Sequence, residues 1–118
     1  MTQSPAVLVH FKDLELESEV DEGVRSLIDR RCEQLADEFR EVARFEINVE
    51  EDGSGFVVHG HATGKNTNVA THVTATDVLP ATDQVLDKIE RQLRRLHDKR
   101  IFGRRRDAQK APPKRQLA

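Results

Sequence analysis

Four basic residues recur every three or four positions late in the sequence: Lys88, Arg91, Arg95 and Lys99. Because this spacing places side chains on one side of an α-helix, the sequence predicts a row of positive charges along a helix. Such a row suits a nucleic acid, since each Lys or Arg that contacts a phosphate releases a condensed counterion. No aromatic residue is interleaved with the row. The predicted contact is therefore with a nucleic-acid backbone or groove rather than with stacked bases.

A solvated helix face is the alternative interpretation of this row. Asp87 lies four residues before Arg91, and Asp98 lies next to Lys99. Local pairs of opposite charge on a helix surface would neutralise part of the row. Composition and spacing alone leave both interpretations open.

Three histidines form a second group with possible chemistry. His59 and His61 are two residues apart in a predicted strand and share one face, and His72 lies on the next predicted strand. Zinc needs three or four ligands in a tight shell, and no Cys pair or Glu-rich partner accompanies these residues. We therefore expect polar residues on an open sheet face, and a metal enzyme at the histidines is a separate hypothesis. No metal and no other cofactor is predicted.

The single cysteine, Cys32, falls on the apolar stripe of a predicted helix, four residues after Ile28. This position predicts a small buried side chain, whereas a catalytic thiol would need a neighbouring base. The sequence contains no phosphate-cradling Gly loop and no Ser/His/Asp spacing that points to an active site. The protein is therefore predicted not to be an enzyme and to have no small-molecule substrate.

Hydrophobic periodicity predicts the elements that position these residues. The helix with the basic row is predicted over residues 77–101, with an apolar stripe beside the row formed by Val85, Leu86, Ile89, Leu93 and Leu96. Another helix begins at Ser18 and has a stripe that runs to Phe39. Apolar alternation predicts strands at 6–11, 42–51, 56–63 and 69–76. The predicted fold class is α+β in the order β-α-β-β-β-α, a four-stranded sheet with both helices packed on one face.

Charge is divided unevenly along the chain. Residues 1–80 hold 7 Lys/Arg and 16 Asp/Glu, whereas residues 81–118 hold 12 and 5. This polarity favours an anionic partner for the C-terminal part. A length of 118 residues predicts one domain, over 1–102, with Gly103 ending the helix and a disordered basic tail over 103–118. One cysteine, no signal peptide and no long apolar run predict a cytoplasmic protein without membrane contact.

The assembled residues resemble the ribosome hibernation-promoting factor family, which includes the ribosome-associated inhibitor and was long called sigma-54 modulation protein. The resemblance covers about residues 7–100 and is strongest over 86–99, L-D-K-I-E-R-Q-L-R-R-L-H-D-K, which is similar to the family's second helix. The run H-F-K-D-L-E-L at 10–16 is similar to the end of the family's first strand and the following link. Leu79 stands where the family usually has Tyr, and 80–82 read P-A-T in place of A-A-I.

The resemblance implies a bacterial stress-response protein that binds the small ribosomal subunit in the channel for messenger RNA and transfer RNA, near the A and P sites. Translation would stop there, and basic residues of both helices would contact ribosomal RNA. The positions that match the family's contacts, together with their basic neighbours on the second helix, are Lys88, Arg91, Arg94, Arg95, Lys99, Arg25 and Arg31. The chain would be a short form, without the C-terminal dimerisation domain of long members.

Two other functions are alternatives at this stage. A general double-stranded-RNA-binding module has a similar element order and a basic second helix, and it would bind any duplex in a length-dependent way. A protein-interaction adaptor would use the acidic body of the domain, and its partners would remain bound after nuclease treatment.

Overall fold

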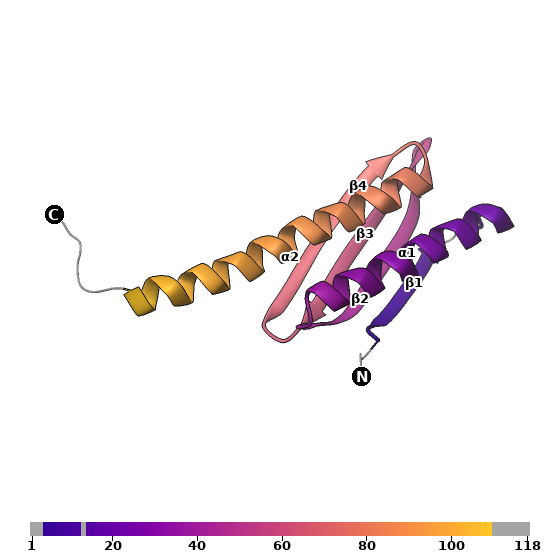
Figure 1. The fold of residues 1–118 in the computed structure, drawn as a ribbon. Helices are drawn as coiled ribbons and strands as arrows, with labels where there is room; N and C mark the ends of the chain where they lie inside the picture. The colour runs from indigo at the N-terminus through magenta and orange to yellow at the C-terminus, as the bar shows by residue number, and fades with distance from the viewer. Residues whose placement is uncertain (1–3, 13, 110–118) are drawn as a thin grey trace.

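The computed structural model describes residues 4–12 and 14–109, with the backbone alone from residue 100 onward. Six elements follow one another along the chain (Figure 1): β1 (Ala6–Lys12), α1 (Ser18–Glu38), β2 (Val42–Asp52), β3 (Gly55–Gly64), β4 (Thr67–Ala75) and α2 (Val78–Gln109). The predicted α+β class and the order β-α-β-β-β-α are confirmed. The strand ends agree with the predicted ones to within two residues.

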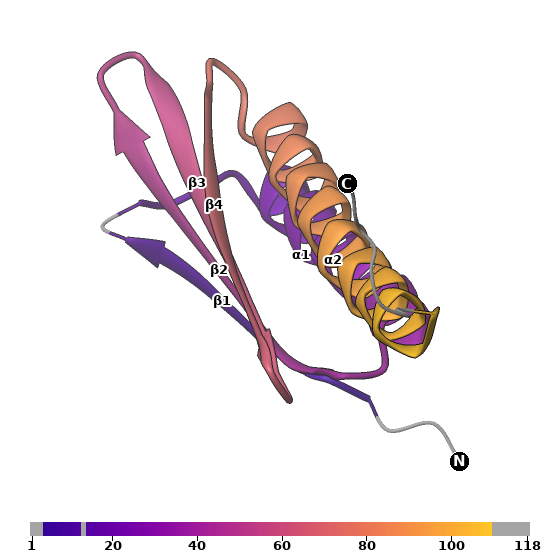
Figure 2. The same ribbon diagram turned by 90° about the vertical axis from the view of Figure 1, so that its left-hand side faces the viewer.

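The four strands form one sheet in the order β1-β2-β3-β4. β1 pairs with β2 in parallel, because α1 carries the chain back across the sheet between them. β2, β3 and β4 form an antiparallel meander. Its tight turns use positive φ at Gly53 (65°) and at Asn66 (55°). Both helices lie on the same face of the sheet (Figure 2), as the two apolar stripes predict.

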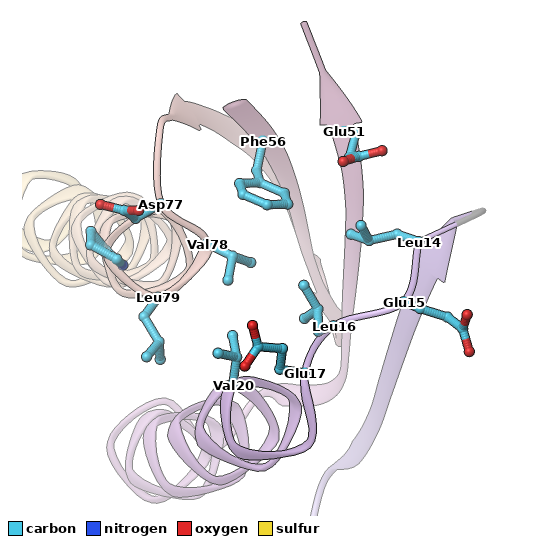
Figure 3. Close-up of a pocket in the computed structure, with 11 residues that line it drawn as sticks. Leu14, Glu15, Leu16, Glu17, Val20, Glu51, Phe56, Asp77, Val78 and Leu79 are labelled. Atoms are coloured by element: carbon cyan, nitrogen blue, oxygen red, sulfur yellow. The ribbon is translucent and has the colours of Figure 1, made fainter. Parts of the chain in front are cut away.

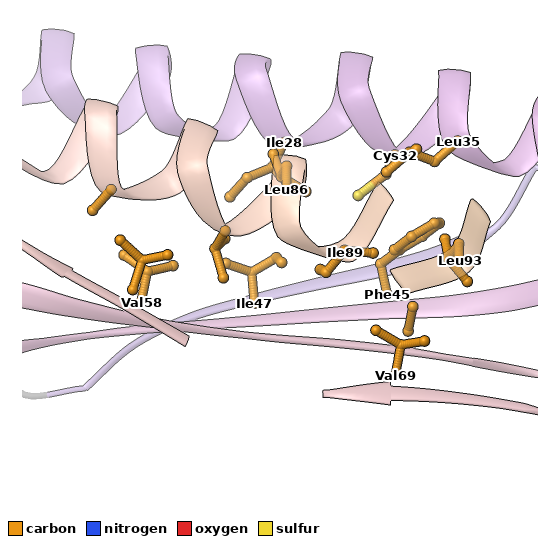
Figure 4. Packing of buried hydrophobic residues seen from close by; sticks show 14 of the residues in the cluster. Ile28, Cys32, Leu35, Phe45, Ile47, Val58, Val69, Leu86, Ile89 and Leu93 are labelled. Carbon is orange, nitrogen blue, oxygen red and sulfur yellow. The ribbon is translucent and has the colours of Figure 1, made fainter. Parts of the chain in front are cut away.

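The core lies between that face and the helices. Alternation on β2 buries Phe45, Ile47 and Val49 completely, and they meet the stripes of α1 and α2 in one cluster (Figure 4). The buried face of α2 begins earlier than predicted, because Val78, Ala81 and Thr82 are also buried. The Thr82 hydroxyl donates a hydrogen bond to the Val78 carbonyl at 2.7 Å, so this buried polar group is satisfied.

Gly60 of β3 lets α2 lie close to the sheet. A Cβ atom at this position would come within 2.7 Å of Ile89 Cδ1 and 3.2 Å of Val85 Cγ2. We expect Gly60→Val to lower the free energy of unfolding by about 1–3 kcal/mol, because the extra methyl groups overpack this contact. Urea denaturation measures the change. Thr74→Val, at an exposed position of the neighbouring strand, is the control and should cost less than about 0.5 kcal/mol. Equal stability of both variants would contradict the close contact.

The prediction that Gly103 ends the second helix is wrong. α2 continues through this residue to Gln109. Glycine within a helix costs only about 1 kcal/mol relative to alanine, and Arg104, Arg105 and Arg106 are good helix formers that follow it. Residues 103–109 of the predicted tail are therefore helical, and the rest of that prediction, 110–118, lies outside the described residues.

Candidate nucleic-acid interface

The flank of α2 that faces α1 carries acidic residues, and one arginine of α1 binds them. Arg31 donates hydrogen bonds to Asp83 and Asp87, each at 2.8 Å, and to Glu90 at 3.3 Å. Its side chain is only 16% exposed. Arg31, which the sequence placed among the RNA contacts, thus lies between the two helices and holds them together.

The three carboxylates determine the ionisation of Arg31. Desolvation disfavours its charge, but the hydrogen bond to Asp87 and the charges of Asp87, Asp83 and Glu90 outweigh that cost. Together they raise the pKa of the Arg31 guanidinium above its ordinary value. The ion pairs therefore persist at every pH at which the three acids are ionised.

Arg94 binds the same acidic flank. Its guanidinium contacts Glu38 of α1 at 2.7 Å and Glu90 at 2.8 Å, and it lies over the Phe39 ring, 5.6 Å from the centroid. The hydrogen bond to Glu90, followed by that to Glu38, raises the pKa of Arg94. This second predicted RNA contact is engaged with acidic side chains of the domain.

Replacing Arg31 tests the link between the helices. We expect Arg31→Met to lower the free energy of unfolding by about 1–2 kcal/mol, because three half-exposed acids lose their shared partner. Arg91→Met makes the same change of charge at an exposed position on the opposite flank, and it should cost less than about 0.5 kcal/mol. Thermal and urea unfolding of both variants gives the comparison. Indistinguishable stabilities would show that the ion pairs do not join the helices.

The opposite flank of α2 carries the predicted basic row. Lys88, Arg91, Arg95 and Lys99 are all exposed. The Lys88 ammonium donates to the backbone carbonyl of His72 on β4 at 3.3 Å, so this flank lies along the β4 edge of the sheet. Among the side chains that the structure describes, residues 4–12 and 14–99, the other three make no hydrogen bond or ion pair.

Neither of the two local pairs that would have neutralised the row, Asp87 with Arg91 and Asp98 with Lys99, is formed among the described side chains. Asp87 is bound by Arg31 across the helix interface and not by Arg91. Three acids of α2, Asp83, Asp87 and Glu90, pair with Arg31 of α1, whereas the cations of the basic row are exposed to solvent. This segregation favours the nucleic-acid interpretation over a solvated face of balanced charge.

A groove of about 350 Å³ runs between the basic row and the start of β4. Arg95 and Lys99 line one side, Asn68 lines the other, and Gln92 and Leu96 complete it. The groove combines two cations with two amides, which can donate to phosphate or ribose oxygens. Gln92 could have been found from the helical spacing, since it lies between the apolar stripe and the row. Asn68 could not, because its place depends on the strand register.

The structure brings together four of the seven predicted contact residues and separates the other three. Arg25 lies near the opposite edge of the sheet, where it stacks over Phe11 of β1 at 4.8 Å and pairs with Asp21 at 2.6 Å. Arg31 and Arg94 are held by acids. The coherent basic surface is therefore the row Lys88, Arg91, Arg95 and Lys99, which we call the basic row of α2.

The histidines lie on the sheet face that the helices leave open. His59 and His72 are register partners, and their ring centroids are 5.8 Å apart. His61 Nε2 is hydrogen-bonded to Asn68 Oδ1 at 2.6 Å. In the described part of the chain, no three His, Cys, Asp or Glu side chains come together in a way that could hold a metal ion.

Cys32 is buried, as its position on the stripe predicts. Burial, together with the charge of Asp29, raises the pKa of its thiol to about 12. The reactive thiolate is therefore strongly disfavoured at neutral pH, and Cys32 serves as a small apolar side chain of the core.

Comparison with known proteins identifies the family. The sequence profile described as "Sigma 54 modulation protein / S30EA ribosomal protein" matches residues 9–101. The chain belongs to this family. The match includes α1, α2 as far as residue 101 and the basic row, and it confirms the resemblance found in the sequence. The family places the chain among ribosome-associated proteins.

Two solved structures share the fold at low sequence identity. A ribosomal subunit interface protein from Coxiella burnetii is 11% identical with a TM-score of 0.62, over 80% of this chain and 99% of its own. The N-terminal domain of Thermus thermophilus Protein Y is 14% identical with a TM-score of 0.61, over 80% and 99%. At these identities the likeness establishes the fold. No protein with a curated description matches the chain.

None of the described helices is long and apolar enough to cross a bilayer.

Proposed function

We propose that this protein is a ribosome hibernation factor of the bacterial cytoplasm, induced under stress. It binds the small ribosomal subunit near the channel for messenger RNA and transfer RNA, at the A and P sites, and inhibits translation without catalysis. The observation that carries the proposal is the basic row of α2, whose cations are exposed and separated from the acids of the same helix. Family membership supplies the ribosome as the partner.

The geometry of the row suits ribosomal RNA. From Lys88 to Lys99 the helix rises by about 17 Å, at 1.5 Å per residue, so the four cations can reach several successive phosphates. The underlying helix is fixed to the sheet by fully buried side chains such as Ile89 and Leu93. A rigid row of charges loses little entropy when it binds, which favours a shaped RNA surface over a mobile chain.

The remaining cations of the predicted site have a supporting role in this proposal. Arg31 and Arg94 fix the angle between the helices through their ion pairs. Arg25 has a half-exposed side chain and offers a contact at the β1 edge, outside the main surface. The open sheet face and the acidic flank of α2 point away from RNA.

Sedimentation with purified ribosomal subunits tests the proposal. We expect the protein to pellet with the small subunit at one copy per particle, and binding to fall steeply as salt is raised. An in vitro translation reaction should stop at the same protein concentration. Binding to free RNA duplexes that grows with duplex length, without preference for the small subunit, would instead identify a general double-stranded-RNA-binding module. Partners retained after nuclease treatment, without ribosomes, would identify an adaptor.

A further inference from the structure

A pocket of about 530 Å³ opens at the N-terminal ends of the two helices, away from the basic row. Its apolar lining comes from the β1–α1 link, from β3 and from the start of α2. Figure 3 shows Leu16, Phe56 and Val78 pointing toward the shared space. At its edge Leu79 is 39% exposed, so its side chain extends the apolar surface of the pocket. The pocket therefore offers apolar area that a ligand could cover.

Four acidic residues contribute to the lining of this apolar space: Glu15, Glu17, Glu51 and Asp77. All four are exposed, and none of their side chains has a hydrogen bond or ion pair with a described residue. None of the described residues that line the pocket is Lys, Arg or His. An apolar floor within an acidic rim selects a ligand with positive charges beside a small apolar group.

The chain itself contains a segment of this chemistry. Residues 110–118 read K-A-P-P-K-R-Q-L-A. The segment has three cations, Lys110, Lys114 and Arg115, and no acidic side chain, and its apolar groups are two prolines and Leu117. Its charge is complementary to the rim, and its prolines and leucine match the apolar floor. Proline also limits the entropy that such a segment loses on binding.

The segment cannot reach the pocket of its own chain. α2 has 32 residues, so its ends are about 48 Å apart at 1.5 Å per residue, and the pocket lies at its first turn. The nine residues after Gln109 span at most about 32 Å when fully extended. Figure 1 shows the C-terminal end of α2 projecting beyond the sheet, away from the pocket end. The pocket can therefore receive the segment only from another molecule.

We propose that the acid-rimmed pocket binds residues 110–118 of a second copy of this chain. The contact is heterologous, because a tail of one copy enters the pocket of the next, and it joins the copies head to tail. Its charged groups are exposed, so the association weakens as salt is raised. A nine-residue segment gives modest affinity, with a dissociation constant of roughly 10–100 µM. The contact goes beyond the proposed function and forms in the absence of ribosomes.

Sedimentation equilibrium of the full, nuclease-treated chain at low salt tests the proposal. We expect the average mass to rise above the 13.4 kDa of the monomer as concentration increases. Glu17→Lys with Glu51→Lys neutralises the rim, because two carboxylates then face two ammonium groups, and Lys114→Glu with Arg115→Glu reverses the charge of the segment. Each double variant should weaken the association at least about tenfold. Glu33→Lys with Asp37→Lys changes the charge equally at exposed positions outside the pocket and should associate as the parent does. Thermal melts confirm folding.

A mixture of the rim variant and the segment variant provides the sharpest readout. Each should be monomeric alone, yet the mixture should associate, because the unchanged segment of one fits the unchanged pocket of the other. A parent chain that stays monomeric at 500 µM, which is about fivefold above the weakest expected dissociation constant, would overturn the proposal. So would a segment variant that associates normally, since that result would show that the copies associate without residues 110–118. Ribosome binding is measured in a separate experiment, so the proposed function and the proposed contact between copies can each fail without the other.

Discussion

Leu93→Asp is expected to unfold the domain. Leu93 is fully buried in the cluster that joins α2 to the sheet and to α1 (Figure 4). The substitution removes a core side chain, which costs about 2–5 kcal/mol, and it places an unpaired carboxylate where water is excluded. A small domain has only about 5–15 kcal/mol in total. Circular dichroism at 25 °C should show loss of the cooperative thermal transition.

Arg91→Asp is the matched control for this change. It introduces the same residue into the same helix, two positions earlier, at an exposed site. Aspartate is a poorer helix former than arginine, so a loss of about 0.5 kcal/mol is expected from propensity alone. The difference between the two variants isolates the effect of burial. A cooperative melt for Leu93→Asp at the temperature of the parent would show that α2 does not dock through this face.

The fold was predictable because its periodicities are strong. Phe45, Ile47 and Val49 alternate as a half-buried strand requires, and Leu86, Ile89 and Leu93 recur at helical spacing. Both patterns reflect contacts between neighbours in one element, which the sequence records directly. The wrong prediction that the second helix ends at Gly103 also came from a local signal. A glycine is a local signal of a helix end, and it says nothing of a favourable run of arginines on its far side.

The candidate site was predictable only in part. The basic row is a property of one helix, so spacing sufficed to find Lys88, Arg91, Arg95 and Lys99. Arg31 and Arg94 differ from them only in their partners on the other helix. The sequence places Asp87 four residues from Arg91, and this suggests a local pair, but the packing of α1 turns Asp87 toward Arg31. Which cations remain free is decided by interhelical geometry, and this geometry follows from the whole core.

The acid-rimmed pocket was likewise hidden in the sequence. Its walls come from three parts of the chain: 14–20, 51–56 and 77–80. The carboxylates there look like ordinary surface residues of a helix start, a strand end and a turn. They become a site only when the β1–α1 link is laid beside the start of α2, and no periodicity encodes that arrangement.

Reversal of the basic row is expected to abolish binding to the small subunit and leave the fold intact. The triple variant is Lys88→Glu with Arg91→Glu and Arg95→Glu. The three positions are exposed, and glutamate is as good a helix former as lysine or arginine. A charged hydrogen bond contributes about 1.5–3 kcal/mol, so the loss of three contacts predicts a decrease in affinity of about a thousandfold or more. Repulsion between the new carboxylates and phosphate adds to the loss.

Single substitutions connect this loss to individual phosphate contacts. Arg91→Ala or Arg95→Ala should weaken binding moderately and reduce the slope of log affinity against log salt by about one unit each. Co-sedimentation with the small subunit across a salt series measures both quantities, and a thermal melt controls for folding. If these residues are only solvated side chains on the helix surface, their substitution should change neither the affinity nor the slope.

A second triple variant separates the position of the charges from their number. Arg30→Glu with Arg40→Glu and Arg44→Glu reverses three exposed cations that lie outside the basic row. It changes the net charge by the same amount, so any effect of overall charge on association with a polyanion is shared by both variants. If overall charge alone mattered, both triple variants would bind the small subunit equally weakly. A defined contact surface instead predicts that only the row variant loses subunit binding and translation arrest. If the row variant still pellets with the small subunit and still stops translation in vitro, the basic row of α2 is a solvated face, and the ribosome must be bound through another surface of the domain.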